Sequence, residues 1–429
     1  MSLVRFPVRR PVGLPVRSVL GGVFAFSPDQ VSSTQAFYDP SDLTSLYQSR
    51  TGGANVSADG QTVGIMLDKS QMGGKTAAAF IAGAAEVVAP LDFETGWAYS
   101  GAIVTPTSSN SYTAAGLANY YKEVLTTGVT YVLTITATFT SSSLILYNNI
   151  SGTDTITSLS SGVSKTVIFT AVNANFNIRP GSAGDVTINN ISIKALPGHH
   201  ALAPSDAARP LYKTAANTGK AGYAAAMAAQ PELVTNGTFD TDTDWTKGTG
   251  WTISGGVATH DAVASGFLNP ITPILEENKT YLISWSVVGT SGLSLRTGTT
   301  STVVVSDMHA VSSAVVTVKG GTALAVYAHA GSMAGPVSID NVSVKEVPAA
   351  YLHRYVDYDG VDDVLNATLP NLGSTASVWY MKQDGTAVYA ANQSISGAYA
   401  LPAVDMRGLI IVDGPISASD QTKLATYYA

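Results

Sequence analysis

Pairs of carboxylates are the groups in this sequence that could do acid–base chemistry. There are three such pairs: Asp39 with Asp42, Asp357 with Asp359, and Asp362 with Asp363. A glycosidase places two carboxyl groups about 5 Å or about 6.5–9.5 Å apart across a sugar. These pairs, however, lie in turn-rich segments, where aspartate side chains commonly turn the backbone. The sequence has no HExxH, Walker or nucleophile-elbow motif and no cysteine, so we expect no catalytic residues and a protein that is not an enzyme.

Flat aromatic side chains are the groups that could bind sugar, because they stack on the C–H faces of sugar rings. The candidates are Trp245, Trp251 and Tyr281. Trp245 has a counterpart in Trp97, and a tryptophan repeated at one position more often packs in a core. Trp285 lies in the apolar stretch YLISWSV and is also expected in the core. Trp251 is therefore the residue that we expect to be exposed for carbohydrate binding.

The composition shows what kind of scaffold must position these residues. The chain has 429 residues, which is too many for one hydrophobic core, so several domains are expected. Thr, Ser, Gly and Val are abundant and only 12% of the residues are charged, as in short strands joined by tight turns. A net charge of −7 argues against a nucleic-acid partner, and no run of 18 apolar residues could span a membrane.

Residues 1–36 are expected to form an extended N-terminal arm. Pro7, Pro11 and Pro15 interrupt every apolar run, which excludes a helix and a signal peptide. Two interpretations remain: the arm folds back on its own chain, or it docks on a partner subunit. We favour docking, because such arms bury little surface on their own body. The anchor residues would be Arg5, Phe6, Arg9, Arg10 and Arg17.

Two segments, residues 91–196 and 232–347, look like copies of one module. Each contains an acidic stretch ending in tryptophan, then a strand (TYVLTITAT, TYLISWSVV), then a closing strand (INNISIKAL, IDNVSVKEV). The separations are 245 − 97 = 148, 281 − 131 = 150 and 339 − 188 = 151 residues. Three anchors in one order at nearly constant separation indicate a duplication. Apolar and polar residues alternate in the closing strands, which predicts a β-sandwich in each copy.

Residues 236–258 (NGTFDTDTDWTKGTGWTISGGVA), with the closing strand IDNVSVKEV, resemble the carbohydrate-binding-module-like jelly rolls of phage virion proteins and bacterial extracellular enzymes. The first copy lacks the NGTFD opening and the second tryptophan. The resemblance implies a structural Ca²⁺ between the opening acidic segment and the last strand. The matching positions are Asn236, Asp240 and Asp340 in the second copy, and Asp92 and Asn189 in the first. The alternative is that these residues form Asx turns at strand ends.

The remaining segments form a series that is similar to phage proteins with a laminin-G-like, concanavalin-A-like domain. The series is FYDPSDLTSLYQ (37–48), GQTVGIMLDKS (60–70), ARPLYKT (208–214), YVDYDGVDDVL (355–365) and RGLIIVDGPISASDQTKLATYY (407–428). The resemblance implies one discontinuous frame made of residues 37–90, 197–231 and 348–429, with a module inserted at each gap. Only 66 residues (429 − 363) follow Asp363, so we expect a reduced frame that has lost its own sugar site.

The sequence thus predicts an all-β, multi-domain protein, with jelly-roll modules inserted in a discontinuous frame and an extended N-terminal arm. These resemblances imply a non-enzymatic structural protein of a tailed-bacteriophage virion, a fibre, spike or decoration subunit. Its expected partners are other virion proteins, a host surface glycan and copies of itself, as a homotrimer. It would be made in the host cytoplasm and reside in the virion. The alternatives are a polysaccharide depolymerase and a bacterial extracellular carbohydrate-binding protein, which should carry a secretion signal.

Overall fold

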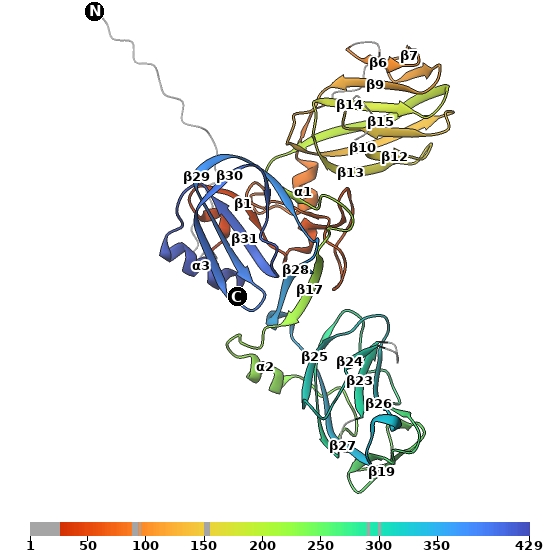
Figure 1. The fold of residues 1–429 in the computed structure, drawn as a ribbon, viewed down its shortest axis with the longest axis vertical. Helices are drawn as coiled ribbons and strands as arrows, with labels where there is room; N and C mark the ends of the chain where they lie inside the picture. Colours follow the sequence, from red (N-terminus) through yellow and green to blue (C-terminus); the bar gives the residue numbers. More distant parts are fainter. Residues whose placement is uncertain (1–25, 88–92, 94–95, 150–154, 290–291, 299–301) are drawn as a thin grey trace, which may run out of the picture.

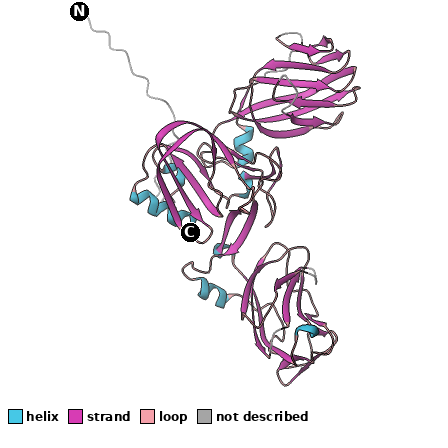
Figure 2. Cartoon of the chain, in the orientation of Figure 1, coloured by secondary structure: helices cyan, strands magenta, loops and turns pink. Residues whose placement is uncertain are grey.

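The computed structural model describes residues 26–87, 93, 96–149, 155–289, 292–298 and 302–429. Almost all the regular structure in these residues is strand, arranged in five sheets (Figure 2), which confirms the all-β, multi-domain class. No helix among the described residues is long and apolar enough to cross a membrane. The predicted anchor residues Arg5, Phe6, Arg9, Arg10 and Arg17 and the predicted ligand Asp92 lie outside the described residues.

Module 1 is a sandwich of a long sheet and a short sheet. The long sheet has the order β13 (Lys165–Thr170), β10 (Thr130–Phe139), β15 (Gly184–Leu196), β8 (Ser111–Ala114), β7 (Val104–Ser108), with β5 (Ala85–Glu86) also on β15. The short sheet has the order β12 (Thr155–Leu159), β11 (Leu144–Tyr147), β14 (Asn175–Pro180), β9 (Ala118–Glu123), β6 (Ala98–Gly101). Their inward side chains form one apolar core.

Module 2 repeats this order strand for strand, as a duplication predicts. Its long sheet runs β25 (Ser313–Thr317), β22 (Thr280–Val288), β27 (Val337–Glu346), β20 (Val257–His260), β19 (Trp251–Ser254). Its short sheet runs β24 (Val303–Val305), β23 (Leu293–Gly298), β26 (Ala323–Ala328), β21 (Gly266–Pro270), β18 (Trp245–Lys247). Matched contacts accompany the matched strands: Phe93 packs 4.9 Å from Trp97 and Phe239 packs 5.0 Å from Trp245, centroid to centroid.

The repeated unit also includes a short helix before each sandwich. These helices are α1 (Ala77–Ala82) and α2 (Tyr223–Ala229). Lys194 of the last strand of module 1 donates to the carbonyl of Ala82 at 2.8 Å, and Lys345 donates to the carbonyl of Ala228 at 3.5 Å. Glu86 then accepts from Ile193 N, just as Glu232 accepts from Val344 N, both at 2.6 Å. Module 1 therefore begins before residue 91, whereas the sequence predicted a start at residue 91.

The frame is a ten-stranded sheet that collects three distant segments of the chain. Its strands run in the order β17 (Leu211–Ala216), β28 (Leu352–Asp357), β31 (Met406–Val412), β29 (Asn366–Lys382), β16 (Ala201–Leu202), β4 (Ile65–Met66), β2 (Leu46–Ser49), β3 (Gly52–Asn55). In addition, β1 (Thr34–Tyr38) pairs with β31, and β30 (Ala387–Ala400) pairs with β29. Because Thr34 already pairs with Val412, the frame begins before residue 37 and takes in part of the predicted arm.

The strand β31 pairs with β28, β29 and β1, and every residue of its sequence, MRGLIIV, is buried. One face packs on the main frame core, and the other packs under helix α3 (Ala418–Tyr428). Ser417 caps α3 by accepting a hydrogen bond from Asp420 N. A Cβ at Gly408 would lie 1.9 Å from the ring of Tyr428, so this glycine allows the helix to approach the strand.

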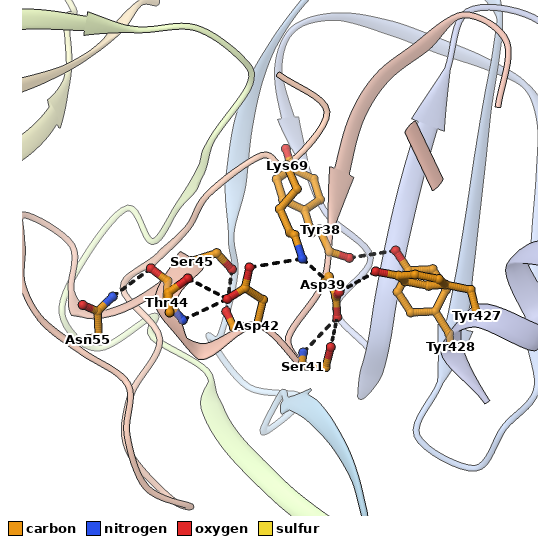
Figure 3. A network of polar contacts seen from close by, with 10 residues as sticks. All are labelled: Tyr38, Asp39, Ser41, Asp42, Thr44, Ser45, Asn55, Lys69, Tyr427 and Tyr428. Carbon is orange, nitrogen blue, oxygen red and sulfur yellow. Dashed lines mark hydrogen bonds and ion pairs between the residues drawn. The ribbon is translucent and has the colours of Figure 1, made fainter. Parts of the chain in front are cut away.

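A polar network joins the first and last segments of the frame (Figure 3). The ammonium of Lys69 lies 3.1 Å from Asp39 and 3.2 Å from Asp42, and the Tyr427 hydroxyl donates to Asp39 at 2.9 Å. Burial disfavours the ammonium, but the charges of Asp39 and Asp42 outweigh it and raise the pKa of Lys69. The Tyr428 hydroxyl donates to the carbonyl of Tyr38. The FYDP motif, the LDKS motif and the C-terminal helix are thus connected by one polar network.

Each module leaves the frame from a pair of adjacent antiparallel strands. Module 1 lies between β4 and β16, which pair at Met66 and Ala201, and module 2 lies between β17 and β28, which pair at Ala216 and Leu352. The frame consequently lies between the two modules along the long axis of the molecule (Figure 1). At each insertion point the two frame strands form an ordinary antiparallel pair, of the kind that a short turn can connect.

The two modules are attached differently. Tyr47 and Ile65 of the frame, Phe80 of α1, and Val132 and Ile168 of module 1 belong to one shared apolar cluster. The core of module 2 consists of its own residues, from Val234 to Val344. Its contacts with the frame include an ion pair of Lys319 with Asp59 and a hydrogen bond from Thr317 to the carbonyl of Thr214. Module 1 is therefore packed onto the frame, whereas module 2 is held mainly by its two connecting strands.

This difference predicts the result of two matched deletions. Replacing residues 217–351 by a two-residue Asn-Gly turn should leave a folded frame with module 1, because Ala216 and Leu352 are already paired. Deleting residues 77–196 should destabilise the frame. Each apolar partner that is lost, such as Phe80 or Ile168, contributes about 1.5–3 kcal/mol when buried. Thermal unfolding of both variants measures this, and equal behaviour of the two deletions would refute the difference in attachment.

Candidate functional site

The three aromatic residues predicted to bind sugar lie in the core of module 2. Trp245, Trp251 and Tyr281 are only 4%, 5% and 1% exposed. The indole N–H of Trp251 donates to the carbonyl of Gly266, and the Tyr281 hydroxyl accepts from Glu276 N. The expectation that Trp251 is exposed is wrong, because the alternation of β19 turns Trp251 and Ile253 inward. These residues hold the sandwich together and offer no face to a ligand.

The residues implied as calcium ligands have hydrogen-bonding roles within their own loops. The side-chain oxygen of Asn236, which has a φ of 52°, accepts from Thr241 N, and its amide group donates to the carbonyls of Thr241 and Thr243. Asp240 accepts from the Thr238 hydroxyl. These contacts bind the side chains within the opening loop but are not the side-chain bond to the backbone N–H two residues on that defines an Asx turn.

The other two described positions differ from each other. Both carboxylate oxygens of Asp340 accept from Asn341, and Asn189 is exposed on β15. Among the described residues, three carboxylates with oxygens within 4.8 Å of one another occur at Asp359, Asp362 and Asp363, in the frame. Calcium binding by the modules stays a prediction from the resemblance.

A different set of side chains gathers on the outer face of the short sheet of module 2. The inward residues of β26 are Leu324, Val326 and Ala328, so Tyr327 faces outward. Phe267 of β21 stands directly opposite Tyr327, and their ring centroids are 4.5 Å apart. Both side chains are half-buried.

Arg296 of β23 and His329 complete this outer row. The guanidinium of Arg296 lies 4.1 Å from the ring centroid of Tyr327 and 5.6 Å from that of Phe267. The imidazole of His329 stands edge-on to Tyr327 at 4.5 Å. Its Nε2 lies 2.9 Å from the hydroxyl oxygen of Ser294. Burial and the charge of Arg296 lower the pKa of His329, so this imidazole is neutral at neutral pH.

A cavity of about 290 Å³ adjoins the outer row. It is lined by Gly292, Ser294, Val303, Ser306, Asp307, His329 and Ser332. His329 therefore belongs both to the row and to the cavity wall, and Ser294, whose hydroxyl contacts the His329 imidazole, is also in the wall. The arrangement offers two aromatic rings and a delocalised cation beside hydroxyl, imidazole and carboxylate groups. Such a surface can contact the C–H groups of a sugar and hydrogen-bond its hydroxyls at the same time.

Sequence reasoning missed the outer row because it considered the tryptophans first. The signal was present in the alternation of GFLNP, LSLRT and AVYAHA, where Phe267, Arg296 and Tyr327 occupy the positions between buried residues. Large side chains on the outward positions of three strands of one sheet, two of them aromatic and one an arginine, were the pattern to find. That the three strands are neighbours, however, became visible only with the sheet order.

Module 1 carries a related but poorer arrangement at the same place. The pairing of Ile145 with Arg179 matches that of Ser294 with Tyr327, so Tyr147 and Arg179 occupy the positions of Arg296 and Tyr327. The guanidinium of Arg179 lies 5.7 Å from the ring centroid of Tyr147. The cation and the ring have thus exchanged strands between the two copies.

The rest of the row has no aromatic counterpart in module 1. Continuing the register of β14 and β9, which ends at Ile178 and Tyr120, puts Asn119 at the place of Phe267. Gly181 follows β14 as His329 follows β26. The aromatic row is therefore a feature of module 2.

No family model matches the sequence, and no curated protein matches it. Among solved structures, the chain is similar to the N-terminal CBM22-1-CBM22-2 tandem domain from Paenibacillus barcinonensis Xyn10C. The identity is 13%, the match covers 62% of this chain and 98% of that chain, and the TM-score is 0.21.

The burial of Trp251 and the partial exposure of Tyr327 predict different losses of unfolding free energy when each side chain is truncated to alanine. Trp251→Ala should lower the unfolding free energy of module 2 by about 3–5 kcal/mol, because it leaves a cavity in the core. Tyr327→Ala should cost less than this, because it leaves no cavity in the core; it loses ring contacts worth about 0.5–1.5 kcal/mol and the apolar area that the half-buried ring covers. Denaturant unfolding followed by tryptophan fluorescence measures both. A mild effect of Trp251→Ala would show that this side chain is not in the core.

Proposed function

We propose that this chain is a non-enzymatic display protein that binds glycan through the outer face of the short sheet of module 2. The observation that carries the proposal is the row of Phe267, Tyr327 and His329 with Arg296, beside a cavity of about 290 Å³. Rings facing outward on neighbouring strands form a platform, and the polar groups around them supply donors and acceptors. This combination suits a sugar better than it suits an apolar ligand or an ion.

The different attachment of the two modules supports different roles for them. Module 1 shares an apolar cluster with the frame, which fixes it as part of the body. Module 2 extends from the paired strands β17 and β28, with its core separate from that of the frame. Module 2 therefore forms a separate body at one end of the molecule (Figure 1). We propose that module 2 is the part that meets the glycan.

The aspartate pairs have structural partners, which supports a function without catalysis. Asp39 accepts from Ser41 and Tyr427 and pairs with Lys69. Asp359 accepts from the backbone N–H of Val361 and of Asp362, which makes it the cap of a turn. A carboxylate held in this way already has a role in folding. A polysaccharide depolymerase, the alternative, would need a second carboxyl group facing a sugar site.

The place of this protein in a larger assembly is also a proposal. The resemblances in the sequence and the proline-rich segment at residues 1–25 support a virion subunit that assembles with other virion proteins and with copies of itself. We propose that it acts on the surface of a phage particle as a fibre, spike or decoration subunit, in a homotrimer, for attachment to a host surface. Many copies on one particle would compensate for the weakness of single sugar contacts, since linking sites raises avidity by about 10²–10⁴.

The glycan proposal predicts a loss of multivalent binding when the platform is removed. Beads bearing many copies of the full chain should retain a subset of bacterial capsular and O-antigen polysaccharides on an array. The Phe267→Ala/Tyr327→Ala variant should lose this binding, and its thermal midpoint should fall only modestly, because both side chains are half-buried on the outside of the sheet. The matched control is Tyr147→Ala/Arg179→Ala in module 1, which should bind normally. Equal binding by the platform variant and the wild type would rule out this face.

A further inference from the structure

A buried histidine lies at the root of module 1, where the chain leaves the frame and returns to it. The outgoing connector, residues 67–76, runs from β4 to α1, and the returning connector, residues 197–200, runs from β15 to β16. His200, at the end of the returning connector, is only 2% exposed. Its ring stands edge-on to the ring of Phe80 of α1, with the centroids 6.3 Å apart. His200 is therefore enclosed where module 1 meets the frame.

Asp68 of the outgoing connector joins the two connectors through a reciprocal pair of hydrogen bonds. Its backbone N–H donates to Nδ1 of His200 at 3.0 Å, and its carboxylate accepts from His199 N at 2.8 Å. The same carboxylate is fully buried and accepts from Phe37 N at 3.0 Å and from Ser70 N at 2.8 Å. The first strand of the frame and both connectors of module 1 thus meet at this aspartate.

The hydrogen bond at Nδ1 requires a neutral imidazole. Because Nδ1 of His200 accepts from Asp68 N, this nitrogen carries no proton in the folded chain. An imidazolium is a donor at both nitrogens, so its Nδ1–H would point at the N–H of Asp68. Protonation must therefore break this bond, which is one of the two bonds between the connectors.

The surroundings of His200 favour the neutral form. Burial lowers the pKa of His200 from 6.5 to about 4, although the charge of Asp68 acts in the opposite direction. A histidine in the unfolded or opened chain has its usual pKa of about 6.5. The root of module 1 therefore keeps its full stability above pH 6.5 and loses stability as the pH falls toward 4.

Few other charges face this ring. The titratable groups on the connectors and the surrounding strands are Asp68, Lys69, Lys75, His199, Tyr38, Tyr47 and Lys194. A charge on His199 would lower the pKa of His200 further. Burial raises the pKa of both tyrosines, which therefore stay neutral. Lys69 is held by the aspartates of the polar network, Lys75 is exposed, and Lys194 donates to the last carbonyl of α1.

We propose that His200 and Asp68 form an acid-sensitive joint that holds module 1 on the frame at neutral pH and loosens it in acid. Protonation of His200 removes its bond to Asp68 N and so weakens the link between the two connectors. The outgoing connector leads directly into α1, whose Phe80 packs in the apolar cluster shared by the frame and module 1, so this packing weakens too. Module 2 is held differently, by the backbone pairing of β17 and β28. The joint does not depend on glycan binding by the outer row.

Hydrogen exchange on the full chain at pH 7 and pH 5 tests the joint. The reporters are the amides of Asp68 and of Ile168, which donates to the carbonyl of Thr51 where module 1 meets the frame. After correction for intrinsic exchange rates, both should lose protection about twentyfold at pH 5, the factor expected when opening raises the pKa of His200 from about 4 to 6.5. The amide of Ile283, in a core strand of module 2, should keep its protection.

Two matched variants separate this histidine from others. His200→Asn keeps a side-chain acceptor but does not titrate, so both reporters should be protected equally at pH 7 and pH 5. His353→Asn is the control, because His353 is also buried and also has its pKa lowered to about 4, but lies on β28 at the root of module 2. It should keep the acid response of the wild type. If His200→Asn does not fold, NMR titration of the His200 ring in the wild type replaces it and should give a pKa near 4.

Several results would overturn the proposal. They are equal protection of Asp68 and Ile168 at both pH values in the wild type, an undiminished acid response in His200→Asn, and a pKa of the His200 ring near 6.5. An equal loss of protection at Ile283 would show general unfolding in acid and would also overturn it. Loss of the acid response in His353→Asn would assign that response to the root of module 2 instead.

Discussion

The pairing of adjacent frame strands is the constraint on which the rest of the molecule depends. The strands β4 and β16 pair although 134 residues (67–200) separate them, and β17 and β28 pair across residues 217–351. A module fits into such a gap only if its first and last segments lie close together. The repeated unit meets this condition, since β5 at its start pairs with β15 at its end. A whole sandwich can thus replace a turn without disturbing the sheet.

The same insertion has led to two different outcomes. Module 1 packs Val132 and Ile168 onto the frame, and its outer face carries amides such as Asn119 and Asn177, which hydrogen-bond to each other. Module 2 keeps its core to itself and carries an aromatic row. In both copies a guanidinium contacts an aromatic ring across the same two strands, with the two residue types on opposite strands in Tyr147–Arg179 and Arg296–Tyr327.

The sequence predicts the all-β class and the duplication because strand alternation and repeated anchors are local patterns. It fails at Trp251, since alternation shows which residues share a face but not which face is buried. It also starts module 1 too late, at residue 91, because the bond of Glu86 to Ile193 joins residues 107 apart and no local pattern reveals it. The outer row depends on which strands are neighbours, so it needs the three-dimensional structure.

The central claim is that three distant segments form one cooperative frame from which the modules extend. Native-state hydrogen exchange on the full chain tests this most directly, through the amides of Phe37, Ala203 and Ile410, one from each segment. All three lie in hydrogen-bonded parts of the frame. We expect them to open with one free energy and one denaturant dependence, different from those of the core strands of module 2. Separate openings for Phe37 and Ile410 would contradict the account.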